Sequence, residues 1–302
     1  MNGLTRSVFF GNYFYGICTV ALTIEATLQQ LYPLNGIVYY IFIFTGTVLY
    51  YTHAYIAEPT AIDLTNLRSA WYGYNRGFVR ASQIALTLVV IISGCWLLIP
   101  NWQAFLHMNW QEWAIGGIFP LAAALYYGSA KPSSSTHNLR NQGWIKPFVI
   151  GFVWAGPVTL YPVMFYCIEH GISYEPGLQG LLLFIKNFMF IAMLCIMFDI
   201  KDYAADHNRN LKTFVVELGL RKTIFYILIP LSALGLGTFI LYGILRHFPL
   251  LRILINTIPF LLLITVAYSM HRRKSILYYL AIIDGLMLVK AICGSIGIAL
   301  IK

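Results

Sequence analysis

The chain has 302 residues, of which 59% are hydrophobic and only 10% are charged, and its mean hydropathy is +0.71. Soluble domains use about 45–50% apolar and 25% charged residues, so this composition excludes an ordinary soluble protein and requires lipid around much of the surface. The net charge of +9 suits membrane topology and contact with anionic lipid, and we expect no nucleic-acid partner.

Apolar segments bounded by charge, proline or glycine follow one another along the whole chain. A helix of about 20 apolar residues crosses the roughly 30 Å hydrocarbon core of a bilayer. The sequence therefore predicts an all-α integral membrane protein, a single polytopic domain over residues 1–302 with nine transmembrane helices. The predicted spans are Phe9–Leu28, Ile37–Tyr55, Ile84–Ile99, Trp113–Tyr127, Pro147–Ile168, Leu178–Phe198, Ile224–Leu245, Leu251–Tyr268 and Ile276–Ile301.

Cationic residues gather in alternate loops between these spans. Of the 20 Lys and Arg residues, 15 fall in the N-terminal segment and in the loops after the second, fourth, sixth and eighth spans. Because cationic loops are retained in the cytoplasm, we expect a multi-pass protein with a cytoplasmic N-terminus and an outside C-terminus. The loops after the second and sixth spans also carry most of the acids, which topology does not require.

The sharpest candidate site lies at the cytoplasmic end of the sixth predicted span, where the acids are Asp199, Asp202 and Asp206. If the helix continues, these positions share one face. Three carboxylates repel one another unless a cation lies among them, and Mg²⁺ takes one or two carboxylates, several waters and substrate phosphate oxygens. Lys201 and Lys212 would meet the remaining phosphate charge. The spacing fits a solvated, charge-mixed helix end equally well.

The segment Asp199-x-x-Asp202-x-x-x-Asp206, with the following Leu211–Gly219, resembles the second aspartate-rich motif of the UbiA superfamily of intramembrane prenyltransferases. Its trailing part is similar to that family's Thr-x-x-Val-x-x-Gly segment. The resemblance implies a nine-helix bundle with a central cavity open to lipid, capped at its cytoplasmic mouth by the loops after helices 2 and 6.

A second element lies at the cytoplasmic end of the fourth predicted span. Tyr127-Gly128-Ser129-Ala130-Lys131 is similar to the Tyr-x-x-x-Lys element that helps to position the diphosphate in the same family. The resemblance therefore implies that Tyr127 and Lys131 bind the diphosphate.

The loop after the second predicted span departs from the family pattern Asn-Asp-x-x-Asp-x-x-x-Asp. Asp63 aligns naturally, with Asn66 and Arg68 behind it, and Glu58 would replace one lost carboxylate. The resemblance implies that Asp63 and Glu58 are metal ligands and that Asn66 and Arg68 bind the diphosphate. It also implies that Asp63 is catalytic, together with the metal-binding Asp199, Asp202 and Asp206. Pro59 breaks the helix that would place these acids on one face. One Glu and one Asp would hold a metal more weakly than three acids.

Two functions follow from these motifs. In the first, Mg²⁺ and cationic side chains neutralise a diphosphate leaving group, and a dry aromatic cavity protects the allylic cation from water. We then expect a Mg²⁺-dependent prenyltransferase acting on a prenyl diphosphate and a lipophilic, for instance aromatic, acceptor. In the second, the impoverished loop after the second span indicates a non-catalytic relative that binds a polyprenyl lipid or a partner protein.

Four charged residues fall within predicted spans, where an unpaired charge is costly. Glu25 and Lys186 both lie toward the predicted outer ends of their helices, so we expect a mutual ion pair or snorkelling. Asp284 and Lys290 are six residues apart on one helix, cannot pair directly, and place at least one charge toward the bundle interior. Asp284 then contacts an acceptor substrate or is satisfied by a neighbouring helix.

Overall fold

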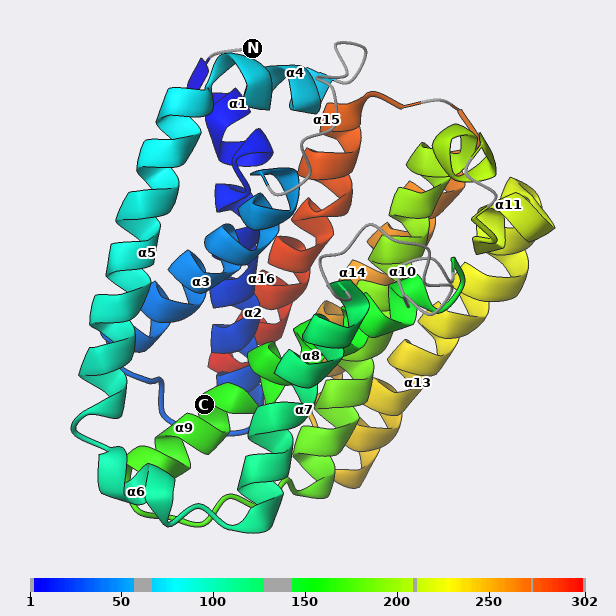
Figure 1. Ribbon diagram of the computed structural model, residues 1–302. Helices are drawn as coiled ribbons and strands as arrows, with labels where there is room; N and C mark the ends of the chain where they lie inside the picture. The colour runs from blue at the N-terminus through cyan, green and yellow to red at the C-terminus, as the bar shows by residue number, and fades with distance from the viewer. Residues whose placement is uncertain (1–2, 57–66, 128–142, 209–210, 273, 301–302) are drawn as a thin grey trace. The chain divides into compact units, whose positions relative to one another are not determined.

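The structure, a computed structural model, describes residues 3–56, 67–127, 143–208, 211–272 and 274–300 (Figure 1). Within these ranges every regular element is helical and none is a strand. The helices in chain order are α1 (Gly3–Phe10), α2 (Tyr13–Gln29), α3 (Ile37–Ile56), α4 (Leu67–Tyr74), α5 (Arg76–Leu98), α6 (Trp102–Leu106), α7 (Trp110–Tyr127), α8 (Lys146–Thr159), α9 (Tyr161–Glu169), α10 (Leu178–Asn208), α11 (Phe214–Leu218), α12 (Leu220–Lys222), η2 (Thr223–Leu228), α13 (Ile229–Leu245), α14 (Leu250–Ser269), α15 (Ile276–Tyr278), η3 (Tyr279–Ile283) and α16 (Gly285–Ala299).

The helices confirm a multi-pass membrane protein. Among the described residues, six helical segments are long and apolar enough to cross a membrane, and a seventh is added if α1 and α2 form one span bent by 60°. The six are Arg76–Leu98, Lys146–Glu169, Leu178–Ala204, Leu220–Leu245, Leu250–Ser269 and Ile276–Ala299. Each of the nine predicted segments overlaps a helix, but the count of nine spans is not confirmed and stays a prediction.

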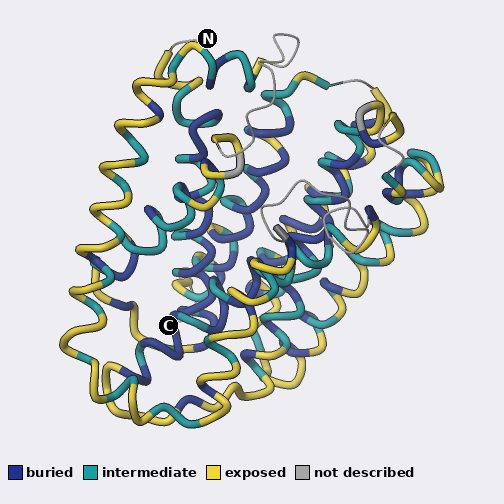
Figure 2. Tube along the Cα trace, in the orientation of Figure 1, coloured by how far each residue is buried: buried dark blue, intermediate teal, exposed yellow. Residues whose placement is uncertain are grey.

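The chain separates into two compact units, one formed by Met1–Ala21 with Leu34–His107 and the other by Leu22–Pro33 with Met108–Lys302. In the first unit α3 packs along α5. In the apolar window of α5 only 6% of the residues are buried, and Figure 2 shows most of this helix as exposed or intermediate. Its surface is apolar, so it is suited to lipid rather than to water.

In the second unit α10 is the central helix, packed against α8 on one side and α13 on another (Figure 1). Its middle turns carry Phe190, Met193 and Met197, which are fully buried. The α8–α10 contact is close at Gly151, as the position of an added Cβ shows: this atom would lie 3.0 Å from the carbonyl oxygen of Phe188. Small residues at such contacts are the usual means of bringing membrane helices together.

Two π-helical turns interrupt the seventh and ninth predicted spans. These are η2, which precedes Pro230, and η3, which ends directly before Asp284. Single π turns within α-helices are frequent at functional sites, because they shift the side chains that follow onto a new face. At η3 the side chain that follows is a buried acid.

Candidate functional site

The three acids of the second motif lie on one unbroken helix, because α10 continues to Asn208. Successive α-helical residues are rotated by about 100°, which places Asp206 within about 20° of Asp199 and Asp202 about 60° away. The burial of the three aspartates follows from these positions around the helix. Asp199 and Asp206 are 1% and 6% exposed, whereas the Asp202 side chain is 41% exposed and pairs with Lys201 at 2.6 Å.

Lys146, the first residue of α8, lies beside these acids. Its Nζ donates a hydrogen bond to Oδ1 of Asp199 at 2.9 Å, and it also interacts electrostatically with Asp206 and Tyr126. Packing of α8 on α10 brings the two partners together although they are 53 residues apart. In the sequence Lys146 is one of the 15 loop cations that predict topology, and no local spacing identifies its partner.

The second oxygen of Asp199 differs from the first. Oδ2 is buried and accepts no hydrogen bond from any residue within the described ranges. Buried carboxylate oxygens nearly always have a partner, so this atom calls for a donor or a cation. A hard anionic oxygen is the kind of ligand that Mg²⁺ prefers.

The metal-binding capacity of the described side chains is limited. Over the parts of the chain that are described, no three His, Cys, Asp or Glu side chains are arranged to hold an ion by themselves. Mg²⁺ does not need three, since it commonly takes one or two carboxylates and completes its shell with water and phosphate oxygens. The donor set therefore fits a magnesium ion that is shared with a phosphorylated ligand.

The segment after α10 has a structural role that accounts for its sequence motif. Thr213 caps α11, its Oγ1 accepting a hydrogen bond from the Val216 N–H at 3.4 Å. Gly219 ends α11 with φ = +77°, a conformation that glycine adopts without steric cost. The Thr-x-x-Val-x-x-Gly pattern is thus the cap, first turn and end of a short helix, while Lys212 beside it is exposed.

A close backbone contact joins this segment to the chain that precedes α8. A Cβ at Gly143 would lie 2.5 Å from the carbonyl carbon and oxygen of Lys212. The Phe214 ring packs beside Trp144 and Phe148, with centroids 6.4 and 6.1 Å away. These contacts fix the start of α8, and with it Lys146, beside the end of α10.

The ninth predicted span contributes to the same region through η3. The Tyr279 ring lies 5.9 Å from that of Phe198, and Tyr279 also interacts electrostatically with Asp202. Asp284 is 3% exposed, and it interacts with Cys195, one turn before Asp199. The structure thus places Asp284 inside the second unit near the acids of α10.

Several residues of the predicted site lie outside the described residues. These are Glu58, Asp63, Asn66 and Lys131, together with the side chain of Tyr127. The predicted first metal motif and its convergence with α10 therefore stay predictions.

Arg68 is described, and it is buried within the first unit. Its Nη2 donates to the carbonyl oxygen of Phe10 at 3.2 Å and to the side chain of Asn12, and its guanidinium lies 4.2 Å from the centroid of the Tyr55 ring. These contacts hold the bend between α1 and α2, where the chain leaves a helix and exposes carbonyl groups. Arg68 thus has a structural role, and its predicted role in diphosphate binding stays a prediction.

Three of the four charged residues within the predicted spans, Glu25, Lys186 and Lys290, form one buried cluster in the second unit. The predicted Glu25–Lys186 pair is confirmed at 3.5 Å, and Lys290 approaches the other carboxylate oxygen of Glu25 at 2.7 Å. Sequence reasoning expected a charge of the last span to face the interior but did not connect Lys290 with Glu25, 265 residues away.

Comparison with known proteins bears on the fold. No protein-family model matches the chain, and neither does any curated protein. A solved structure of digeranylgeranylglyceryl phosphate synthase, studied in membranes, is similar with a TM-score of 0.56 over 99% of both chains, at 14% identity. The likeness concerns the arrangement of helices over the full length, and at this identity it extends to the fold alone.

Proposed function

We propose that the protein is a Mg²⁺-dependent prenyltransferase that moves a prenyl group from a prenyl diphosphate to a lipophilic acceptor within the membrane. The observation that carries the proposal is Asp199, a buried acid at the end of an apolar helix whose Oδ2 lacks a partner among the described residues. The fold shared with a membrane synthase and the resemblance of residues 199–219 to a prenyltransferase motif support the same conclusion.

The ion would be held by Asp199 and Asp206, with Asp202 at the exposed edge of the same helix. When bound, Mg²⁺ would neutralise the charge of the departing diphosphate. Lys146 would orient the Asp199 carboxylate through its bond to Oδ1, and Lys201 and Lys212 would meet outer phosphate oxygens. Each of these residues acts by charge and position, which is the main protein contribution to this kind of group transfer.

The remaining predicted residues complete this proposal. Asp63 and Glu58 would supply carboxylates from the loop after α3, and Asn66, Arg68, Tyr127 and Lys131 would contact the diphosphate. The Phe198 ring of α10 and the Tyr279 ring of η3 lie 5.9 Å apart, and their electron-rich faces would stabilise positive charge on a prenyl group held beside them. The apolar bundle excludes the water that would otherwise capture it.

The test is transfer of radiolabel from short and long prenyl diphosphates into lipid-soluble product, with purified protein in bilayers containing a membrane lipid extract. We expect product with Mg²⁺, none with EDTA, and a loss of roughly 100-fold or more in Asp199→Asn, the scale of losing one electrostatic contact at a reacting centre. Glu169→Gln is the matched control, because Glu169 is an exposed acid at the end of α9. Product that persists in a folded Asp199→Asn protein would refute the assignment.

One observation favours the second function, a non-catalytic membrane protein that binds a polyprenyl lipid or a partner. The Lys146 ammonium already lies 2.9 Å from Asp199 Oδ1, so a protein cation occupies one side of the carboxylate. In that case calorimetry would show binding of prenyl diphosphate that is unchanged by EDTA, and no product would form with any chain length. A Mg²⁺ requirement for binding would favour the enzyme.

A further inference from the structure

Asp284 is a buried acid that the proposed metal site does not use, and a π-helical turn determines where it points. Its N–H donates to the carbonyl oxygen of Tyr279 at 3.2 Å, five residues earlier, which is the closing bond of η3. In an α-helix residues five apart differ by about 140° around the axis, and the i→i+5 bond of a π turn brings them closer to one side. The Tyr279 ring lies 5.9 Å from that of Phe198 on α10. The π turn therefore directs Asp284 toward α10 as well, which agrees with its interaction with Cys195.

Cys195 marks an accessible space on this side of α10. It is half-buried, whereas the residues on either side of it, Leu194 and Ile196, are 2% and 0% exposed. Cys195 interacts electrostatically with three charged groups, those of Asp199, Lys146 and Asp284. Because ionisable side chains within membrane helices face the bundle interior or a cavity, the accessible side of Cys195 belongs to the interior of the second unit.

The position of Cys195 along α10 suits a group that reacts next to the diphosphate. Cys195 comes four residues before Asp199, about 6 Å nearer the middle of the helix. In a prenyl diphosphate the reacting carbon is bonded directly to the diphosphate, and the apolar chain continues from that carbon into the bundle. With the diphosphate beside Asp199, as proposed above, the reacting carbon lies near the level of Cys195 and Asp284.

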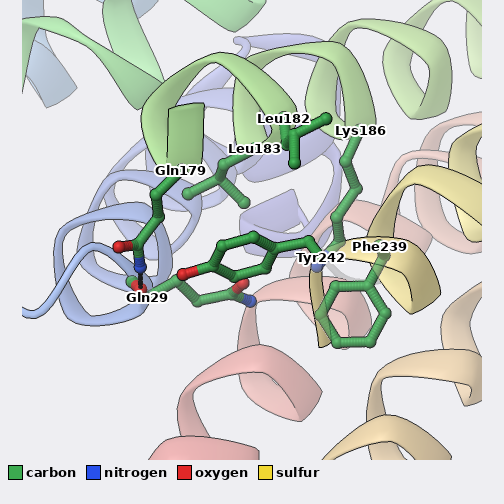
Figure 3. Close-up of a pocket in the computed structure, with 7 residues that line it drawn as sticks. All are labelled: Gln29, Gln179, Leu182, Leu183, Lys186, Phe239 and Tyr242. Atoms are coloured by element: carbon green, nitrogen blue, oxygen red, sulfur yellow. Dashed lines mark hydrogen bonds between the residues drawn. The ribbon is translucent and has the colours of Figure 1, made fainter. Parts of the chain in front are cut away.

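The two lysines of the spans are held elsewhere. Lys290, on the same helix as Asp284, lies 2.7 Å from Glu25, and Lys186 lies 3.5 Å from the other oxygen of that carboxylate. In Figure 3 the Lys186 side chain extends from α10 toward two rings of α13, those of Phe239 and Tyr242. Both lysines thus belong to the cluster around Glu25, and Asp284 is the charge of its span that lies near the proposed transfer site.

We propose that Asp284 binds the acceptor: its carboxylate accepts a hydrogen bond from a neutral hydroxyl or amine group of the acceptor and takes the proton of that group during transfer. This role rests on the proposed prenyl transfer and adds the chemical class of the acceptor. An anionic acceptor group would be repelled by the carboxylates of Asp199 and Asp284, so the attacking group is neutral.

The proposed step is balanced in bonds and protons. The bond between the prenyl carbon and the diphosphate oxygen breaks, and its electron pair stays on the oxygen. A lone pair of the acceptor oxygen or nitrogen forms the new bond to the prenyl carbon. The proton of that atom moves to the Asp284 carboxylate, which acts as a general base, and later passes to water.

The test separates binding of the prenyl diphosphate from transfer to the acceptor. Purified protein in bilayers containing a membrane lipid extract, the source of the acceptor, receives radiolabelled prenyl diphosphate and Mg²⁺, and calorimetry measures the Kd of the prenyl diphosphate. We expect Asp284→Asn to lower kcat for transfer by roughly 100-fold or more, the scale of losing a general base, and to change this Kd by less than about twofold. Asp284→Glu, which keeps a carboxylate, should recover part of the rate, and the exposed control Glu169→Gln should change neither quantity.

A second variant tests the space beside Asp284 without removing a charge. Cys195→Phe fills the accessible side of Cys195 and should lower kcat for transfer by roughly tenfold or more, because the acceptor is displaced from the reacting carbon. Cys95→Phe is the matched control, since Cys95 is exposed on α5. A folded Cys195→Phe protein that transfers like the wild type would overturn the proposal.

The remaining outcomes distinguish this inference from the proposed function. An Asp284→Asn protein that transfers like the wild type, or one that no longer binds prenyl diphosphate, overturns the role of Asp284 as acceptor base. Tandem mass spectrometry of the product should show the prenyl carbon bonded to oxygen or nitrogen, and a new carbon–carbon bond overturns the acceptor class. Absence of transfer by the wild type with every prenyl diphosphate refutes the proposed function itself.

Discussion

At the scale of single residues, the contact that most shapes the candidate site is the one between Lys146 and Asp199. Asp199 is buried, while the Lys146 side chain is 25% exposed, so the pair lies at the edge of the apolar interior. A lone carboxylate at this depth would be costly, and the ammonium offsets much of that cost. The remaining oxygen, Oδ2, is left for a ligand or an ion.

Removal of Lys146 should therefore destabilise the protein. We expect Lys146→Met to lower the free energy of unfolding by roughly 1–3 kcal/mol, less than for a fully buried pair because the lysine is partly exposed. Thermal unfolding in detergent measures the change. The double variant Lys146→Met/Asp199→Asn should recover part of the loss, as expected for coupled partners. Additive losses in the double variant would show that the two residues do not interact.

Gly219 is a second position where one residue type is required. Its φ of +77° lies in the left-handed region, where a Cβ costs about 1–2 kcal/mol. Gly219→Ala should lower the unfolding temperature accordingly and weaken protection of the α11 amides in hydrogen exchange. Gly237→Ala is the matched control, because a Cβ there has open space and lies in a helix, where alanine is favoured. Equal effects of the two changes would contradict a backbone cause.

At the scale of elements, close helix packing within the second unit decides which side chains meet. Where α7 crosses α8, Gly156 faces the Phe119 ring, and a Cβ at Gly156 would lie only 2.3 Å from it. The Phe119 ring also packs with Phe152, at a centroid distance of 4.8 Å. In lipid, contact of this kind replaces the hydrophobic effect as the force that holds helices together.

Gly156→Ala should consequently be destabilising by about 1–3 kcal/mol, because the Phe119 ring has to move within a filled interior. The unfolding temperature measures this. Phe119→Leu in the Gly156→Ala background should restore part of the stability by making room. Gly117→Ala serves as control, since nothing lies within 4 Å of the added carbon. If Phe119→Leu did not restore stability, the destabilisation by Gly156→Ala would not come from its contact with the Phe119 ring.

At the scale of the whole molecule, the distribution of cationic residues predicts how the chain crosses the bilayer. The bundle of apolar helices establishes that it crosses several times, and the positions of Lys and Arg predict the direction of each crossing. The predicted site on α10 would then open to the cytoplasm, and Lys186 would lie toward the outer side.

Cysteine labelling tests this orientation. In a variant without the five native cysteines, we expect Lys212→Cys to react with an impermeant maleimide only after cells are opened, and His247→Cys to react in intact cells. Both positions are exposed, so access to the reagent depends on the side of the membrane. Labelling of both from one side would refute the predicted topology between α10 and α14.

Much of the fold could be predicted because its signals are local. Apolar segments near 20 residues give the positions of the helices, and helical spacing places Asp199 and Asp206 on one face. The same spacing predicted three acids on one face, but the Asp202 side chain is 41% exposed, because it lies about 60° around the helix from Asp199. The nine-span count stays open, because the described residues give six long apolar helical segments and a seventh only if α1 and α2 form one bent span.

By itself, the sequence determined that this protein is a multi-pass helical membrane protein with an acidic helix end, because composition and periodicity are properties of neighbouring residues. The tertiary structure alone decided that Lys146 pairs with Asp199 and that Lys290 joins Glu25 and Lys186. Those partners lie 53 and 265 residues apart, and their meeting depends on which helices pack closely. Packing of that kind is set by the fit of side chains across the whole bundle, which no local pattern contains.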